Sequence, residues 1–453
     1  MELRRLQPFA HPYPTNIPPP SDSPFNYNIT LLYVLVSQLL PAPNVALSEW
    51  NKLGVKQIQM DSLSYRLVGG LVRTGLYVEA VSMCGDVIGV VRNSGASVAE
   101  NAGVAFERGN YMQVMEMVAF QSERMDKSLQ LLEAKAIMLA CAAVSTDGLG
   151  EIDGVCASLE DVERAKAMSD DRLSTYGMLE CMEYEFGRSD VESTCGLYSD
   201  NRDLQVLGSI DFETQGVVDK RSVVVGAGAK FSTQKVVFAA VNCSGGYKPP
   251  KKGKMNAAVV KSGVDLAAIL EEAGTAVAKQ DAIGGGWPVL AGAVRGVAGI
   301  CVGKDEEAAA GIEAALEALE AFKSELVEGE YLVGGKMFEV DWLSKVCAGV
   351  VEALIPICAV VNALCGISKK KKAVRANELR ELLVILLKEL KERMEAGAGG
   401  EEGAKECVEA MGGDASLVAV CGDVLEGCKL SAERVGRILG ELVGNLTPLS
   451  DDF

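Results

Sequence analysis

Apolar residues recur at helical spacing along most of this chain, and one pattern occurs twice. Residues 75–80 read Gly-Leu-Tyr-Val-Glu-Ala, and residues 109–114, which lie 34 positions later, read Gly-Asn-Tyr-Met-Gln-Val. Glycine, an aromatic residue and a small apolar residue at constant offsets indicate two helical hairpins that stack on one another. In such hairpins the glycine relieves the turn and the aromatic ring fills the space between the helices. We therefore predict four packing residues, Tyr77, Ala80, Tyr111 and Val114.

The same register extends towards the N-terminus. One further period back, Ala46 occupies the position of Ala80, and residues 29–40 also carry apolar side chains at helical spacing. A period of this length is typical of tetratricopeptide repeats. We predict tetratricopeptide-like helical repeats over residues 29–204.

The second half of the chain has two clear helical stripes. The first consists of Ile312, Leu316, Leu319, Phe322 and Leu326. The second consists of Leu379, Leu382, Leu383, Leu386, Leu387, Leu390 and Met394, and we expect its helix to begin at Asn377 and a last helix to begin at Ser431. The predicted fold class is all-α: a tetratricopeptide-like α-solenoid, followed by a helical region over residues 256–453.

Two segments do not fit the helical pattern. Residues 1–28 contain seven prolines, which predicts a Pro-rich disordered tail. Residues 205–255 combine β-branched runs with Gly226-Ala227-Gly228, and we interpret them as an irregular linker or insertion. The Gly-x-Gly run does not predict a dinucleotide site, because Phe231 replaces the third glycine and no βαβ alternation follows.

Residues 346–367 are apolar enough to span a bilayer, and lysines follow them. Glu352, Pro356 and Asn362 lie within the segment, and a carboxylate in lipid is costly. We favour a buried helix of a bundle over a membrane span.

Composition excludes several classes of function. The 453 residues carry a formal charge of −18, which disfavours a surface devoted to nucleic acid. One histidine, His11, leaves little basis for histidine catalysis or histidine-ligated metal. The 13 cysteines show no C-x-x-C spacing, so we expect buried, reduced thiols in a cytoplasmic protein. We predict no catalytic, cofactor-binding or metal site.

One basic cluster is a candidate for phosphate contact. It consists of Lys369, Lys370, Lys371 and Lys372, which could approach ribosomal or other RNA electrostatically. No aromatic residues lie among them for base stacking, so sequence-specific recognition is not indicated. The alternative interpretation is a solvated loop.

Four landmarks together resemble a known family. Residues 55–63 read Val-Lys-Gln-Ile-Gln-Met-Asp-Ser-Leu, residues 106–111 read Phe-Glu-Arg-Gly-Asn-Tyr, residues 200–204 read Asp-Asn-Arg-Asp-Leu, and the lysine run follows an apolar helix. In this order they resemble the auxiliary, non-catalytic subunit of the N-terminal acetyltransferase B (NatB) complex. Members of that family carry further repeats before this region.

The resemblance implies a scaffold and not an enzyme. It implies an α-solenoid that holds a catalytic subunit of the GNAT fold near the ribosome and the nascent chain in the cytoplasm. The complex would acetylate N-termini that begin Met-Asp, Met-Glu, Met-Asn or Met-Gln. The alternative is a generic helical-repeat adaptor that binds protein or RNA. We expect no membrane partner.

Overall fold

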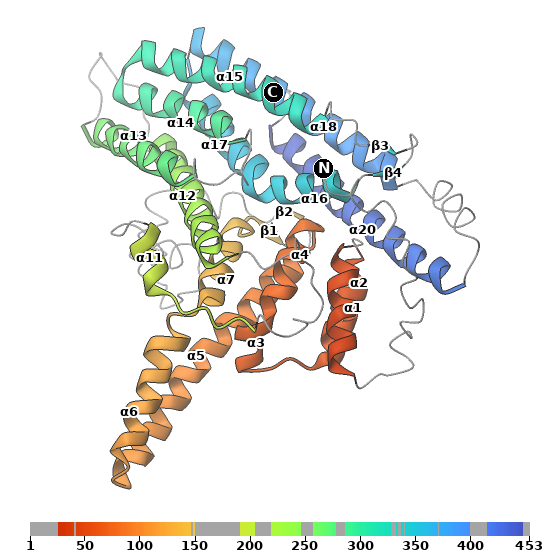
Figure 1. Ribbon diagram of the computed structural model, residues 1–453. Helices are drawn as coiled ribbons and strands as arrows, with labels where there is room; N and C mark the ends of the chain where they lie inside the picture. The colour runs from red at the N-terminus through yellow and green to blue at the C-terminus, as the bar shows by residue number, and fades with distance from the viewer. Residues whose placement is uncertain are drawn as a thin grey trace, which may run out of the picture.

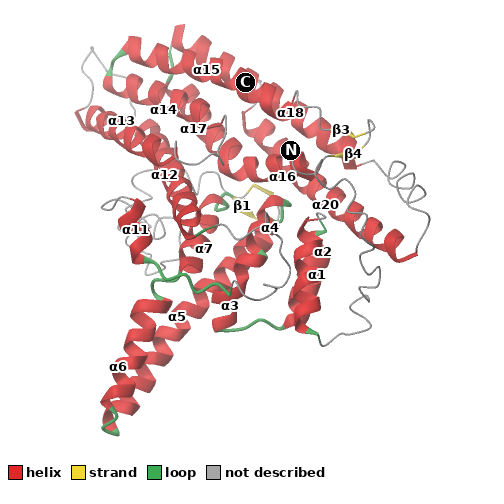
Figure 2. Cartoon of the chain, viewed as in Figure 1, coloured by secondary structure: helices red, strands yellow, loops and turns green. Residues whose placement is uncertain are grey.

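The computed structural model describes residues 26–39, 42–145, 148–149, 191–203, 219–245, 257–277, 286–327, 332–333, 337–338, 340–369, 371–398 and 415–446. Helices form most of these ranges (Figures 1 and 2). Within the described residues, strands occur only in two antiparallel pairs, each of two-residue strands. The prediction of an all-α fold is confirmed. The expected tail falls almost entirely outside the described residues.

The first half of the chain forms mostly short helices and one long one. They are α1 (Tyr27–Leu39), α2 (Pro43–Leu53), α3 (Ile58–Leu63), the 3-10 turn η3 (Ser64–Arg66), α4 (Val68–Arg73), α5 (Tyr77–Glu107), α6 (Tyr111–Ala119), the π-helical segment η4 (Phe120–Met125), α7 (Leu129–Ala140) and α11 (Val191–Leu197). Strands β1 (Val144–Ser145) and β2 (Gly148–Leu149) pair between α7 and α11.

Longer helices make up the second half and pack side by side (Figure 1). They are α12 (Lys220–Gly245), α13 (Ala257–Val277), α14 (Gly286–Val302), α15 (Asp305–Val327), α16 (Val340–Gly349), the π-helical segment η7 (Val350–Leu354), α17 (Ile355–Ile367), α18 (Lys371–Ala398) and α20 (Ala415–Leu446). Strands β3 (Leu332–Val333) and β4 (Met337–Phe338) pair before α16.

The 34-residue repeat marks two equivalent turns. Gly75 precedes α5 with φ of +73°, and Gly109 precedes α6 with φ of +74°. This left-handed conformation is strained for residues with a Cβ, which explains glycine at both positions. Asn110 then caps α6, since its side chain accepts a hydrogen bond from the Gln113 amide.

Both predicted stripes lie in the core. All five residues of the first stripe are buried in α15, and six of the seven in the second are fully buried in α18, with Leu382 partly buried. Helix α14 approaches this face of α15 so closely that a Cβ at Gly292 would lie 2.6 Å from the Ala315 backbone nitrogen. Small residues thus allow the two helix backbones to touch.

The apolar segment after α15 is a core helix. Residues Trp342–Ile367 run through α16, η7 and α17, and by length and composition they could cross a membrane. However, 72% of the most apolar window is buried inside the protein, and Val360, Val361 and Leu364 are fully buried. This burial supports the buried bundle helix that the sequence favoured.

The irregular linker predicted for residues 205–255 is wrong over its central part. Residues 220–245 form α12, which begins after Asp219, whose carboxylate accepts a 2.8 Å hydrogen bond from the Ser222 amide. Val223, Val224 and Phe231 are buried there, because α12 packs against α7, α13 and α17. Tertiary packing therefore overrides the weak helix propensity of valine and glycine. Residues 204–218 and 246–256 lie outside the described residues.

Two expected helix starts are also wrong. Helix α18 begins at Lys371, six residues before Asn377. Ser431 lies within α20, and its hydroxyl donates a 2.9 Å hydrogen bond to the Gly427 carbonyl oxygen. A serine can satisfy its hydroxyl in this way inside a helix, so a serine before an apolar stripe is an ambiguous start signal.

One buried ion pair joins α12 to the π-helical segment. The Lys230 ammonium lies 2.9 Å from the Glu352 carboxylate, and the two side chains are 19% and 10% exposed. Burial alone would lower the pKa of Lys230, but Glu352 and, farther away, Glu133 outweigh it and raise that pKa. Glu352 thus favours the charged form of the partly desolvated Lys230, and removing either side chain would leave the other without its partner.

Candidate interaction surface

A polar joint connects three parts of the chain that are distant in sequence, around Asp61, Arg124–Ser128 and Asn201. The Asn201 amide nitrogen donates to Asp61, at 2.8 Å, and to the Arg124 carbonyl oxygen, at 2.9 Å. The Ser128 hydroxyl, which also caps α7, donates to the other carboxylate oxygen of Asp61. These hydrogen bonds hold the loop of residues 198–203 against α3 and α7.

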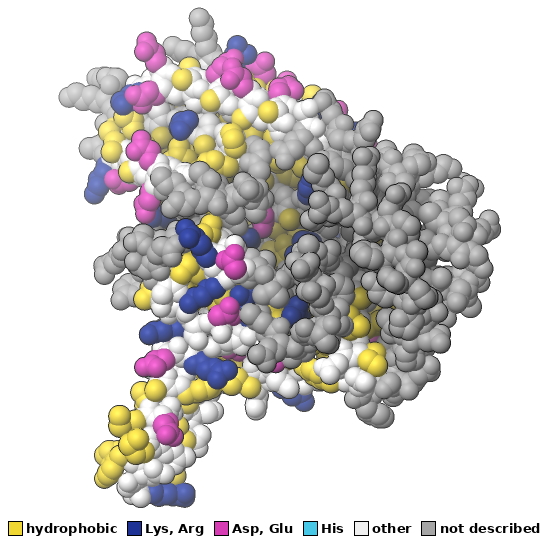
Figure 3. Space-filling view, in the orientation of Figure 1, with side chains coloured by type: hydrophobic (Ala, Val, Ile, Leu, Met, Phe, Trp, Pro, Cys, Tyr) yellow, Lys and Arg dark blue, Asp and Glu magenta, His cyan; other side chains and the backbone are white. Residues whose placement is uncertain are grey.

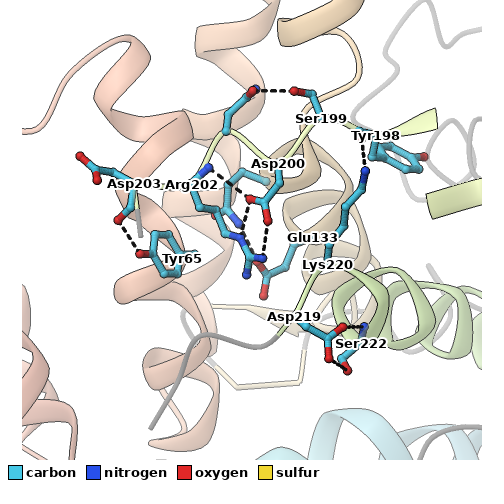
Figure 4. A network of polar contacts seen from close by, with 12 residues as sticks. Tyr65, Glu133, Tyr198, Ser199, Asp200, Arg202, Asp203, Asp219, Lys220 and Ser222 are labelled. Carbon is cyan, nitrogen blue, oxygen red and sulfur yellow. Dashed lines mark hydrogen bonds and ion pairs between the residues drawn. The ribbon is translucent and has the colours of Figure 1, made fainter. Parts of the chain in front are cut away.

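The backbone of residues 198–203 is fixed as well. The Leu129 amide donates to the Ser199 carbonyl oxygen at 3.0 Å, and the Asp203 amide donates to the Ser62 carbonyl oxygen at 2.9 Å. The Tyr65 hydroxyl donates to the Asp203 carbonyl oxygen at 2.8 Å (Figure 4). The landmark at residues 55–63 therefore meets residues 200–203, the described part of the landmark at 200–204.

Arg202 is a further member of this joint and pairs with Asp200. Its guanidinium donates to both carboxylate oxygens of Asp200, at 2.8 and 2.7 Å, and lies 5.6 Å from the centre of the Tyr65 ring. The two hydrogen bonds hold the pKa of Asp200 below its usual range. The arrangement is a structural clamp, since the charged groups of this pair bind one another.

Burial perturbs the carboxylates of the joint in the opposite direction. Asp61 is 1% exposed, and burial raises its pKa despite the hydrogen bonds from Ser128 and Asn201. Burial also raises the pKa of Glu133 on α7, which accepts a 2.9 Å hydrogen bond from Gln130. Both carboxylates accept hydrogen bonds from protein groups, which indicates a role in holding the fold.

The α5–α6 hairpin, by contrast, exposes apolar side chains. It projects from the remaining helices (Figure 1), and hydrophobic side chains gather at its far end (Figure 3). None of the residues of α6 is buried. The exposed set, which we call the hairpin patch, comprises Val104 (41%), Phe106 (61%), Tyr111 (59%), Met112 (66%), Met115 (65%) and Val118 (50%). A contiguous apolar patch on a protruding element is typical of a protein interaction site.

The hairpin patch corrects one prediction and adds a site. Tyr77 and Ala80 are buried as predicted, but Tyr111 is exposed and Val114 is only partly buried. The sequence did contain a signal for this exposure. Apolar residues occur on more than one side of α6, whereas a two-helix hairpin provides α6 with only one long neighbouring helix, α5.

The structure describes only part of the predicted lysine cluster. Lys369 is exposed, and Lys372 is partly buried and forms an ion pair with Asp305. Lys370 and the side chain of Lys371 lie outside the described residues. Phosphate contact by this cluster stays a prediction, and the ion pair with Asp305 already engages one of its four charges.

The described cysteines do not suggest chemistry. Nine cysteine side chains lie in the described part of the chain, and six of these are buried. Burial raises the pKa of Cys141 to about 12, and those of Cys365 and Cys428 to about 11, so thiolates are disfavoured. No group of three metal-ligating side chains is found within the described part of the chain.

A cleft of about 520 Å³ lies between the start of α5 and α20. Across it, Arg434 donates to both carboxylate oxygens of Glu79, at 2.7 and 2.9 Å. The ion pair ties α20 to the first hairpin.

A family model matches the N-terminal part of the chain. The model described as the N-acetyltransferase B complex (NatB) non catalytic subunit matches residues 20–185. Over these residues the chain is similar to the NatB non-catalytic subunits that the model describes. The match includes the polar joint's Asp61 and the whole α5–α6 hairpin, and the family is, as expected from the sequence, one that does not itself catalyse acetyl transfer.

Two solved structures were found to be similar, and the first of them shows a shared fold. A chain of "The NatB Acetyltransferase Complex Bound To CoA and MES" aligns with a TM-score of 0.52 at 16% identity, over 93% of this chain and 47% of that one. A chain of "The NatB Acetyltransferase Complex Bound To bisubstrate inhibitor" gives 0.49 at 14% identity, over 94% and 49%. This chain thus spans about half the length of the chains that it matches. A search of curated proteins found no match.

Proposed function

We propose that this chain is a non-catalytic scaffold subunit of a NatB-type N-terminal acetyltransferase complex. It would hold a catalytic subunit of the GNAT fold and support co-translational acetylation of N-termini that begin Met-Asp, Met-Glu, Met-Asn or Met-Gln. The observation that carries the proposal is the family match over residues 20–185. The helical fold, shared over 93% of the chain with a protein of a NatB complex, supports it.

The described residues support a binding role over a catalytic one. The carboxylates of Asp61 and Glu133 accept hydrogen bonds from neighbouring protein groups, and burial raises the pKa of the Cys141, Cys365 and Cys428 thiols. The hairpin patch, in contrast, offers apolar surface to a partner. A scaffold needs such a surface and needs no reactive group.

Two experiments test the proposal. Affinity purification of the chain from native extract should recover a GNAT-fold acetyltransferase, identified by mass spectrometry. In cells that lack the chain, N-terminal proteomics should show lost acetylation on Met-Asp and Met-Glu starts, while N-termini that begin with Ser or Ala after methionine removal serve as the internal control. Recovery of no acetyltransferase would overturn the proposal.

Ribosome association is a separate part of the proposal. Lys369–Lys372 are the candidate phosphate contacts, and electrostatic binding of this kind weakens steeply with salt. Replacement of Lys369 and Lys370 by Glu should reduce co-sedimentation with ribosomes at low salt and leave the captured acetyltransferase unchanged. Equal co-sedimentation of the wild-type chain and the variant would exclude the lysine cluster as the ribosome contact. Association with ribosomes would also place the chain in the cytoplasm.

A further inference from the structure

The two halves of the 34-residue repeat have opposite surroundings. A Cβ placed on Gly75 would lie 2.9 Å from Val435 Cγ2 of α20 and 3.5 Å from the Cys347 sulfur of α16. The same atom on Gly109 would meet nothing within 4 Å. The two glycines have nearly identical backbone conformations, so the difference lies in what covers each turn.

The aromatic residues that follow these glycines show the same contrast. Tyr77 is 2% exposed, and its hydroxyl donates a 2.6 Å hydrogen bond to the Cys347 carbonyl oxygen. Tyr111 is 59% exposed and touches Phe106 edge to face, with 5.3 Å between ring centres. The first repeat is thus covered by helices α16 and α20, and the second repeat presents the equivalent surface to solvent.

The pattern holds along both helices. Cys84 is fully buried in α5, whereas Val118, 34 positions later, is 50% exposed. Val81 is partly buried against the core, whereas its counterpart Met115 is 65% exposed. Positions that are buried against a neighbouring helix in the first repeat are therefore also apolar in the second repeat, but there they are exposed to solvent.

Charges around the hairpin patch restrict the partner further. Between residues 95 and 119 the charged side chains are Glu100, Glu107, Arg108 and Glu116, and all four are exposed. Three carboxylates and one guanidinium give an acidic rim, which complements a basic partner. A second copy of this chain would bring a like-charged rim and a formal charge of −18. Methionine-rich surfaces such as this one adapt well to an apolar helix.

From these observations we infer that the hairpin patch is a docking surface for a helix of the catalytic subunit. That helix would cover the second repeat in the way that α16 and α20 cover the first. It would carry a stripe of small apolar residues flanked by Lys or Arg, and it would offer a hydrogen-bond acceptor to the Tyr111 hydroxyl. The inference rests on the proposed function and adds to it the surface and the chemistry of the contact.

Charge insertion tests the surface directly. The probe is the acetyltransferase that copurifies with the wild-type chain. In a Met112→Glu/Met115→Glu variant, two carboxylates would have to be buried against the partner's apolar stripe, so we expect recovery of the acetyltransferase to fall roughly tenfold or more. The matched control is Val264→Glu/Val374→Glu, which places the same charges at exposed apolar positions, 53% and 67% exposed, outside the hairpin. The control should retain the partner.

A second measurement does not depend on the variants folding equally well. A photoreactive benzoylphenylalanine at position 111 should crosslink to the acetyltransferase, and one at Glu317, exposed on α15, should not. Circular dichroism melting of each variant shows whether the fold is intact.

The outcomes are distinguishable. Loss of the partner from the hairpin variant alone, together with crosslinking from position 111, supports the inference. Full recovery by the hairpin variant, or a dimer of the chain that the same variant converts to a monomer in light scattering, overturns the inference and leaves the proposed function intact. Absence of an acetyltransferase from the wild-type capture overturns the proposed function, and the inference with it.

Discussion

The Asn201 amide nitrogen lies 2.8 Å from the Asp61 carboxylate, although 140 positions of sequence separate the two residues. This hydrogen bond closes the polar joint that fixes residues 198–203 onto α3 and α7. The joint lies where the α5–α6 hairpin leaves the body of the protein, because Arg124, at the end of that hairpin, also accepts from Asn201. The orientation of the hairpin patch therefore depends on Asp61 and Asn201.

Removing the Asn201 side chain should destabilise the protein. Asn201→Ala leaves one buried oxygen of Asp61 without its donor, and an unsatisfied buried polar group costs about 1–3 kcal/mol. Denaturant unfolding followed by circular dichroism measures this loss. The matched control is Asn101→Ala, since Asn101 is exposed and donates only to the Ser97 carbonyl oxygen. Equal stability of the two variants would mean that the joint contributes nothing.

The ionisation of Asp61 should make stability depend on pH. Because burial raises its pKa in the folded state, the folded protein binds more protons than the unfolded chain between the usual aspartate pKa and the raised value. The contribution of this group to stability therefore falls as pH rises through that window.

Asp61→Asn isolates this term, since asparagine keeps the shape and cannot ionise. Relative to Asp61→Asn, the wild-type protein should become more stable as pH is lowered from 7 towards 4.5, measured as the difference between their melting temperatures. A difference that is constant over this range would show that Asp61 titrates in the folded protein as it does in the unfolded chain.

Sequence periodicity predicted those elements whose packing repeats locally. The stripes of α15 and α18 are buried because each lies on one face of its helix and packs against neighbouring helices, and the turn at Gly75 follows from local backbone sterics. The sequence did not predict helix α12, because the valine runs around Gly226 are typical of strands. Its helical conformation depends on packing against α7, α13 and α17.

The candidate site could be predicted only in part, for a similar reason. Tyr77 and Tyr111 have the same local sequence pattern, yet one is buried and the other exposed, because α16 and α20 return from more than 260 positions away to cover only Tyr77. The hydrogen bond between Asp61 and Asn201 likewise depends on a chain path that no periodicity encodes. The family resemblance located both segments, and the structure showed that they meet.

The two turn glycines should respond differently to the same substitution. Alanine in the left-handed conformation costs about 1–2 kcal/mol at either position. At Gly75 the new methyl group would also lie 2.9 Å from Val435, and such overpacking costs about 1–3 kcal/mol more. Gly75→Ala should therefore unfold at lower denaturant than Gly109→Ala, and the reverse order would contradict the packing of α20 over the first turn.

The buried pair of Lys230 and Glu352 provides the most severe test of the helical body. Lys230→Met leaves the carboxylate of Glu352 desolvated between α12 and η7, and breaking a buried pair in this way costs about 3–5 kcal/mol. Adding Glu352→Gln removes the unpaired charge, so the double variant should recover much of the loss, as a double-mutant cycle in denaturant would measure. Lys304→Met is the control, because the Lys304–Glu307 pair is exposed on both sides and should contribute at most about 1 kcal/mol. If Lys230→Met were no more damaging than Lys304→Met, then water would have to reach Glu352, and the contact between α12 and the apolar core helix would be looser than its 2.9 Å ion pair indicates.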